Sequence, residues 1–222
     1  MLRKTWVIGT VLLGMSTSAL CSGFYVGAGL GPSYADFEKS AHVVHTGYSD
    51  MNVFDKSHLA SMGMFGTVFG GYGYVHKHFY LGEEVNLSFD SVDSEASNND
   101  SAHMTFSTTN YTMNRSCGVS VLPGLLVTDK TLLYARLGYA NGNLKITTGD
   151  TSLANVDKNL NGFRFGAGIK QSFSKKVSMR MEYSQVNYGK TTMLVPVDSI
   201  TKDTTITPSL AQVEFGLVYD FA

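Results

Sequence analysis

The sequence lacks the features of several common classes of protein. It has two cysteines and four prolines in 222 residues, and its formal net charge is −1. So small a charge excludes the cation excess of a nucleic-acid-binding protein, and no nucleic-acid partner is expected. After residue 22, no run approaches the roughly 20 consecutive apolar residues that a membrane helix requires. The glycines form no phosphate-binding loop, and cysteine pairs with zinc-site spacing do not occur.

The first 22 residues have the pattern of a secretory signal peptide. Arg3 and Lys4 precede an apolar run from Trp6 to Leu13, which is too short to span a bilayer. Small residues follow and provide a cleavage region around Cys21. We therefore predict a signal peptide over residues 1–22 and one mature domain over residues 23–222. Cys117 then has no cysteine partner, which excludes an intramolecular disulfide.

The C-terminal residues alternate between apolar and polar or small side chains. Because side chains alternate across a strand, one face carries Ala211, Val213, Phe215, Leu217, Tyr219 and Phe221. The other face carries Gln212, Glu214, Gly216, Val218 and Asp220. A strand between lipid and a side-chain-filled lumen requires this division.

Similar alternation occurs in eight segments of about 10 residues, the length of a tilted membrane strand. They cover approximately residues 24–30, 59–72, 79–89, 112–125, 132–144, 162–173, 177–188 and 211–222. The glycine-rich second segment has no assignable faces. Short turns are expected at 74–78, 127–130 and 174–176, and long polar loops at 34–57, 90–110, 145–161 and 189–207. This rhythm predicts an all-β, eight-stranded antiparallel transmembrane β-barrel with up-and-down meander order. A soluble lipocalin-like barrel is the alternative, but it would turn its apolar faces inward.

Three strand segments resemble the transmembrane domain of outer-membrane protein A: Phe79–Val85, Leu133–Gly138 and Ser178–Tyr183. The C-terminal insertion signal of outer-membrane barrels is matched by Glu214, Gly216, Tyr219 and Phe221, with Ala222 one residue beyond it. The chain is therefore similar to the OmpA and opacity-protein barrel superfamily. The resemblance implies a bacterial outer-membrane location and contact with the barrel assembly machinery, outer-membrane lipids and lipopolysaccharide.

Alternation directs six charged side chains into the lumen: Glu84, Arg136, Arg164, Lys170, Arg180 and Glu182. An eight-stranded barrel is narrow enough to be filled by side chains, so these charges must find partners. The resemblance implies a glutamate that pairs with arginine or lysine as a gate, and we expect Glu84, Lys170 and Arg180 to meet. Leu122 occupies the position at which the family carries a lysine, so a fixed polar core is favoured over a gate.

The six histidines show no spacing that would bring three or four metal ligands together, so neither a metal nor a cofactor is predicted. Barrel enzymes that modify lipopolysaccharide prompted a search for a serine and a histidine two residues apart. Ser40 and His42, and Ser101 and His103, have this spacing, but both pairs fall in expected loops. We predict no catalytic residue and no enzymatic activity.

Three functions remain as hypotheses. The favoured one is a structural and surface-interaction role, adhesin-like or in envelope integrity, in which a rigid barrel presents four long loops to host-cell surface factors or lipopolysaccharide. The alternatives are a narrow or gated pore and, less favoured, a lipid-modifying enzyme. The loops contain no recognisable binding motif that would name a ligand.

Overall fold

The computed structural model describes residues 22–45, 53–100, 105–148, 156–197 and 200–221, and this part of the chain is built from strands. None of the described residues belongs to a helix long and apolar enough to cross a membrane. The strands are β1 (Gly23–His45), β2 (Val53–His76), β3 (Phe79–Asp100), β4 (Thr105–Thr128), β5 (Thr131–Thr148), β6 (Val156–Ser172), β7 (Val177–Tyr188), β8 (Thr191–Val197) and β9 (Ile200–Asp220).

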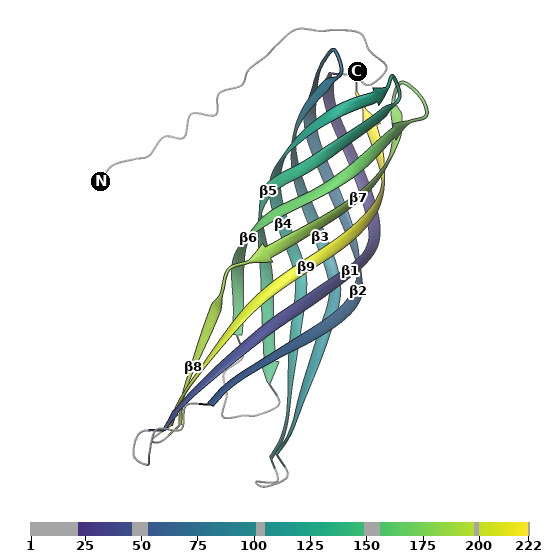
Figure 1. The fold of residues 1–222 in the computed structure, drawn as a ribbon. Coiled ribbons are helices and arrows are strands. Elements are labelled where there is room, and N and C mark those ends of the chain that lie inside the picture. The colour runs from purple at the N-terminus through teal and green to yellow at the C-terminus, as the bar shows by residue number, and fades with distance from the viewer. Residues whose placement is uncertain (1–21, 46–52, 101–104, 149–155, 198–199, 222) are drawn as a thin grey trace, which may run out of the picture.

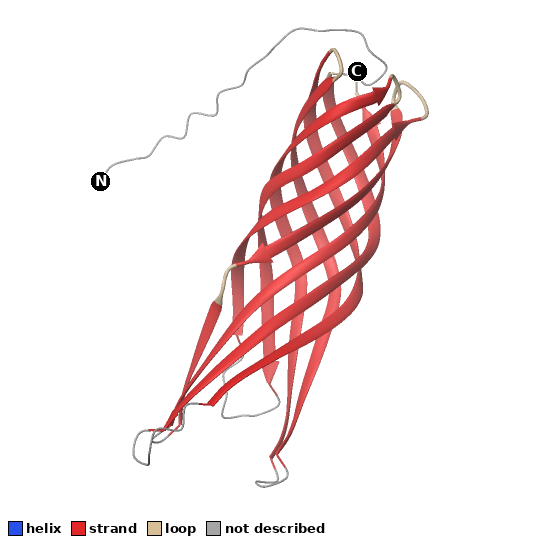
Figure 2. Ribbon diagram, viewed as in Figure 1, coloured by secondary structure: helices blue, strands red, loops and turns tan. Residues whose placement is uncertain are grey.

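The strands close into one antiparallel barrel (Figures 1 and 2). Each strand from β1 to β7 pairs with the next along the chain, and β9 closes the ring against β1. The strands β7 and β8 both pair with β9, one after the other along its length, so they are two parts of one strand interrupted at Gly189 and Lys190. The barrel is therefore eight-stranded with meander order, which confirms the predicted fold class.

The two ends of the barrel differ. The three short turns, at residues 77–78, 129–130 and 173–176, lie at one end, together with the start of β1 and the end of β9 (Figure 1). We call this the turn end, and the opposite end the extended end. All three turns fall where the sequence predicted them.

The four polar stretches predicted as loops are largely strand, which corrects the sequence analysis. The first predicted strand, residues 24–30, is only the beginning of β1, which continues to His45. Likewise β3 continues from the predicted end at residue 89 to Asp100. The physical reason is that polar residues there occupy outward positions, while inward positions still carry buried apolar side chains such as Ala35, Phe37 and Val92. The amino-acid composition of these stretches is therefore similar to that of loops.

Outside, a band of large apolar side chains surrounds the barrel near the turn end. Phe24, Phe79 and Leu217 are more than 60% exposed, whereas a soluble barrel would bury such residues. The predicted faces of the C-terminal strand are confirmed, with Phe215 exposed and Gln212 buried. In the second strand, whose faces the sequence left unassigned, Phe69 points inward and Val68 points outward.

The turn between β2 and β3 offers a local test of stability. Lys77 has φ 58°, the only positive φ among the described non-glycine residues. Because a side chain is disfavoured in this left-handed region, Lys77→Gly should raise the free energy of unfolding by about 0.5–1 kcal/mol. Urea titration of the folded barrel in detergent measures this. The matched control Lys176→Gly, in another turn, should give no gain, and equal gains would contradict the argument.

Candidate functional site

Glu84 is the centre of an ionic cluster in the middle of the lumen. It projects inward from β3 and is 2% exposed. Its Oε1 lies 2.5 Å from Nη2 of Arg136, and its Oε2 lies 2.7 Å from Nη1 of Arg180. The Tyr25 hydroxyl also donates to Oε2, at 3.0 Å. One carboxylate therefore holds side chains from three other strands, β1, β5 and β7.

Each arginine has a second carboxylate. Arg136 pairs with Glu182 through Nε at 2.7 Å. Arg180 pairs with Glu214 through Nη2 at 2.7 Å, and its guanidinium lies 3.5 Å from the centre of the Phe69 ring. We call Glu84, Arg136, Arg180, Glu182 and Glu214 the central ionic cluster. Every member is at most 7% exposed, so each charge depends on its partners rather than on water.

Small residues make room for this cluster. Gly29 on β1 faces the lumen, and a Cβ atom there would lie 2.6 Å from Oε1 of Glu214. At this distance the side chain of Glu214 would have to shift from the position in which it pairs with Arg180, so the glycine allows the carboxylate to approach. The glycines on the inward strand faces therefore belong to the packing of the lumen.

Of the predicted meeting of Glu84, Lys170 and Arg180, the contact between Glu84 and Arg180 is confirmed, but the contact between Lys170 and Glu84 is wrong. The Lys170 amine lies 2.7 Å from Oδ1 of Asp220, and the other oxygen of this carboxylate accepts a hydrogen bond from Ser178 at 3.1 Å. Asp220 is the last residue of β9, so this pair lies nearer the turn end than the central ionic cluster. Lys170 therefore has its own partner, at a different height in the barrel.

Arg164 lies on the other side of the central ionic cluster, toward the extended end. Its Nη1 donates to Oδ1 of Asn86 at 2.9 Å, and among the described residues its Nε and Nη2 have no hydrogen-bond partner. Asp90 is close enough to act on it electrostatically, but its Oδ1 accepts from Gln212 at 2.8 Å. The six charges predicted for the lumen thus occupy three levels along the barrel.

The sequence analysis placed Glu214 and Asp220 on the inward face of the last strand, with Gln212, but did not include them in the predicted set of lumenal charges. It also left out Asp90. Asp90 fell just beyond the predicted end of the third strand. Tyr25 and Tyr134 were also missed, although the Tyr134 hydroxyl donates to Glu182 at 2.7 Å.

Apolar side chains fill the lumen on both sides of the polar levels. Toward the extended end, buried residues form what we call the outer apolar cluster: Ala35, Phe37, Val92, Tyr111, Met113, Ala140, Leu144, Ile146, Leu160, Val186, Tyr188, Ile206 and Leu210. Toward the turn end, an inner apolar cluster contains Val75, Tyr80, Leu122, Leu132 and Tyr134. Leu122 therefore packs among apolar neighbours. The central ionic cluster lies between two apolar layers.

The other residues singled out in the sequence have separate positions. Tyr219 and Phe221 point outward at the turn end with ring centres 5.2 Å apart, but the role of the C-terminal motif in insertion stays a prediction. His58 hydrogen-bonds Asp36 at 3.3 Å on the outer surface. Ser101 and His103 lie outside the described residues, as does the signal peptide up to residue 21, and the side chain of His42 is not described. Among the described residues, no group of three potential ligands is placed to hold a metal ion.

Comparison with known proteins identifies the family. The model of the outer membrane protein beta-barrel domain matches residues 8–221. The chain therefore belongs to this family, and its location is the bacterial outer membrane. The outward apolar band is the surface that such a location requires.

Solved structures share the fold at low sequence identity. OprG from Pseudomonas aeruginosa is 10% identical with a TM-score of 0.56, and the match covers 92% of this chain and 100% of that one. The outer membrane protease OmpT from Escherichia coli is 8% identical with a TM-score of 0.50, covering 90% and 97%. Neisserial surface protein A is 11% identical with a TM-score of 0.49, covering 90% and 98%. No curated protein matches the chain in sequence. The likeness shows the fold alone.

Proposed function

We propose that this protein is a closed scaffold that holds a polar β-structured surface beyond the membrane, in an adhesin-like or envelope-integrity role. The observation that carries the proposal is the outer apolar cluster. Ala35, Val92 and Leu210 are 0% exposed within it. A lumen filled by packed apolar side chains provides no continuous path for ions or polar solutes. This supports a scaffold better than a pore.

The outer wall of the extended end supports the interaction part of the proposal. Exposed amides and charges form hydrogen bonds between neighbouring strands there: Asn141 to Asn161 at 2.6 Å, and Asn143 to Asp157 at 2.6 Å. Polar side chains of this kind are disfavoured in hydrocarbon, so this wall belongs outside the apolar band. A rigid wall that projects from the membrane is a suitable surface for binding.

A lumenal gate has weaker support. A gate needs a glutamate that exchanges one cation for another, but Glu84 is held by Arg136 and Arg180 at once. Leu122, at the position where the family carries a lysine, provides no alternative cation, and it packs in the inner apolar cluster. We also propose no enzymatic activity, since no serine among the described side chains hydrogen-bonds a histidine.

Gene deletion followed by complementation tests the proposed function in cells. The deletion strain should bind host cells less well, or lose envelope integrity, and wild-type protein should restore the lost property. In a porin-deficient strain, expression should leave the uptake of small hydrophilic antibiotics unchanged, with a general porin as positive control. A porin-like rise in uptake would overturn the scaffold proposal.

The orientation of the barrel gives a separate prediction. Outer-membrane barrels place their short turns in the periplasm, so the turn end should face inward and the extended end outward. A peptide tag near Asn98–Asn99 in β3 should be labelled on intact cells. A tag at Lys175–Lys176, in a short turn, should be labelled only after the outer membrane is permeabilised. The reverse result would invert the barrel.

A further inference from the structure

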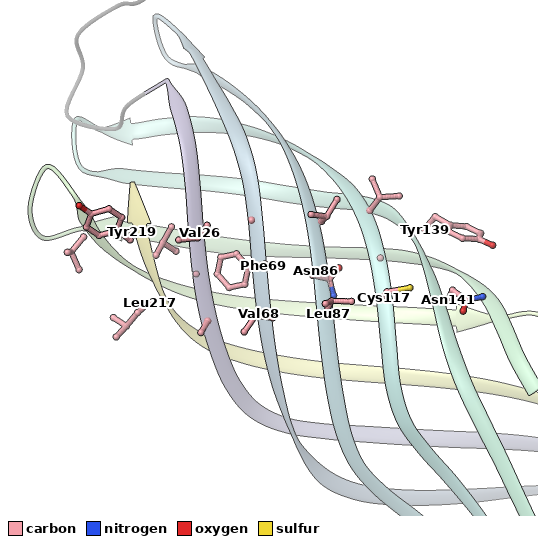
Figure 3. A pocket seen from close by; sticks show the side chains of 18 residues that line it. Val26, Val68, Phe69, Asn86, Leu87, Cys117, Tyr139, Asn141, Leu217 and Tyr219 are labelled. Carbon is pink, nitrogen blue, oxygen red and sulfur yellow. The ribbon is translucent and has the colours of Figure 1, made fainter. Parts of the chain in front are cut away.

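A groove crosses the lipid-facing wall of the barrel. Its volume is about 980 Å³, within the range of ligand sites. Figure 3 shows Leu217 and Tyr219 at one end of the groove, and Cys117, Tyr139 and Asn141 at the other. Nearly all of the lining is apolar, as an acyl chain requires. The groove therefore joins the apolar band to the first polar residues above it.

Small outward residues produce the depression between larger neighbours. Ala28 and Gly70 stand beside Val26, Val68 and Leu217. A Cβ atom added at Gly70 would meet its nearest atom, the carbonyl oxygen of Tyr25, at 3.5 Å, which is an ordinary contact. The backbone at Gly70 therefore does not require glycine. The absence of a side chain leaves space on the outer wall that a larger residue could fill.

A cationic side chain stands directly above the polar end of the groove. Cys117 lines the groove and pairs with Asn141, and Arg115 follows on the same outward face of β4. The strand pairing shifts between Met113 and Ser116, and both intervening residues are exposed. Arg115 has no hydrogen-bond or ion-pair partner in the described part of the chain. Its guanidinium is thus free to bind an anion at the upper edge of the apolar band.

Exposed amides continue from this point onto the polar wall. Asn141 and Asn143 follow Tyr139 on the outward face of β5, and they hydrogen-bond across to Asn161 and Asn159 of β6. Each amide has donor and acceptor capacity beyond these bonds. Such groups, next to an exposed tyrosine ring, suit the hydroxyls and apolar faces of sugars.

We propose that this surface binds one phosphorylated glycolipid of the outer leaflet. An acyl chain occupies the groove, a sugar phosphate accepts hydrogen bonds from Arg115, and the sugars contact the amides of β5 and β6. Charge complementarity and continuity with the lipid-facing band support this occupant over a second copy of the barrel. Because the proposed contacts lie on the outer wall, this proposal does not depend on whether the lumen conducts ions.

Titration with defined lipids tests the site. The folded full chain in neutral detergent is titrated with fluorescent bis-phosphorylated lipid A, with its dephosphorylated form and with phosphatidylglycerol. Arg115→Gln should weaken binding of the phosphorylated form about tenfold, the effect of losing a charge-assisted hydrogen bond, and leave the dephosphorylated form unchanged. Phosphatidylglycerol should bind more weakly than lipid A, because it lacks the sugars.

The groove is tested by filling it. Gly70→Leu should weaken binding of both forms of lipid A. Gly66→Leu is the matched control: it lies on the same strand outside the groove, and the nearest atom to its added Cβ would be 4.0 Å away. Lys176→Gln, which removes an exposed cation at the turn end, controls for net charge.

Three results would overturn the proposal. These are unchanged lipid A affinity in both Arg115→Gln and Gly70→Leu, equal affinity for phosphatidylglycerol, or a dimer that Gly70→Leu dissociates without any change in lipid binding. Heat-dependent gel mobility shows that each variant is folded.

Discussion

Glu84→Ala should lower the free energy of unfolding by about 3–5 kcal/mol, because it leaves two buried guanidiniums without the carboxylate that they share. The side chain of Glu84 is 0% exposed, and those of Arg136 and Arg180 are 2% and 4% exposed. Water therefore screens these charges poorly. Denaturant titration in detergent, followed by heat-dependent gel mobility, measures the loss.

The matched control for this substitution is Glu83→Ala. Glu83 is the neighbouring residue on β3 but points outward, so its removal should change stability by no more than about 1 kcal/mol, and in the stabilising direction. A double-mutant cycle with Arg180→Ala should show coupling, because the two side chains lie 2.7 Å apart. Independent effects would show that the pair does not form.

Phe37→Ala should lower the free energy of unfolding by about 3–5 kcal/mol, through lost burial and a residual cavity. Phe37 is 1% exposed in the outer apolar cluster, and its ring centre lies 5.5 Å from that of Tyr111. The same denaturant titration measures the change. Phe79→Ala removes an identical ring from the lipid-facing surface, where it is 67% exposed, and should cost much less in detergent. Equal losses would mean that the extended end is not packed.

The fold could be predicted because the alternation of apolar and polar side chains and the spacing of the turns depend on local sequence. Strand length could not, since polar residues such as Asn159 and Asn161, in a predicted loop, are also compatible with the outward side of a strand. Only the buried residues of the same stretch, such as Ile146 and Leu160, show that it is a strand. The extended end was therefore predicted as loops.

The site was harder to predict because alternation specifies a face and not a height. It directed Lys170 inward correctly, but Lys170 and Glu84 lie on strands separated by β4 and β5, and their relative level depends on the stagger of the whole ring. Asp220 proved to be at the level of Lys170. Arg136 was predicted to be lumenal, yet its bond to Glu84 depends on the same stagger.

Single-channel recording in planar bilayers tests the central claim, that apolar packing closes the lumen, most directly. Purified protein, shown by its heat-dependent gel mobility to be folded, is inserted at low density under an applied voltage. The sealed barrel predicts a baseline without discrete steps, while a general porin in the same bilayer gives them. Reproducible open and closed levels from the wild-type protein would contradict the claim and favour a pore.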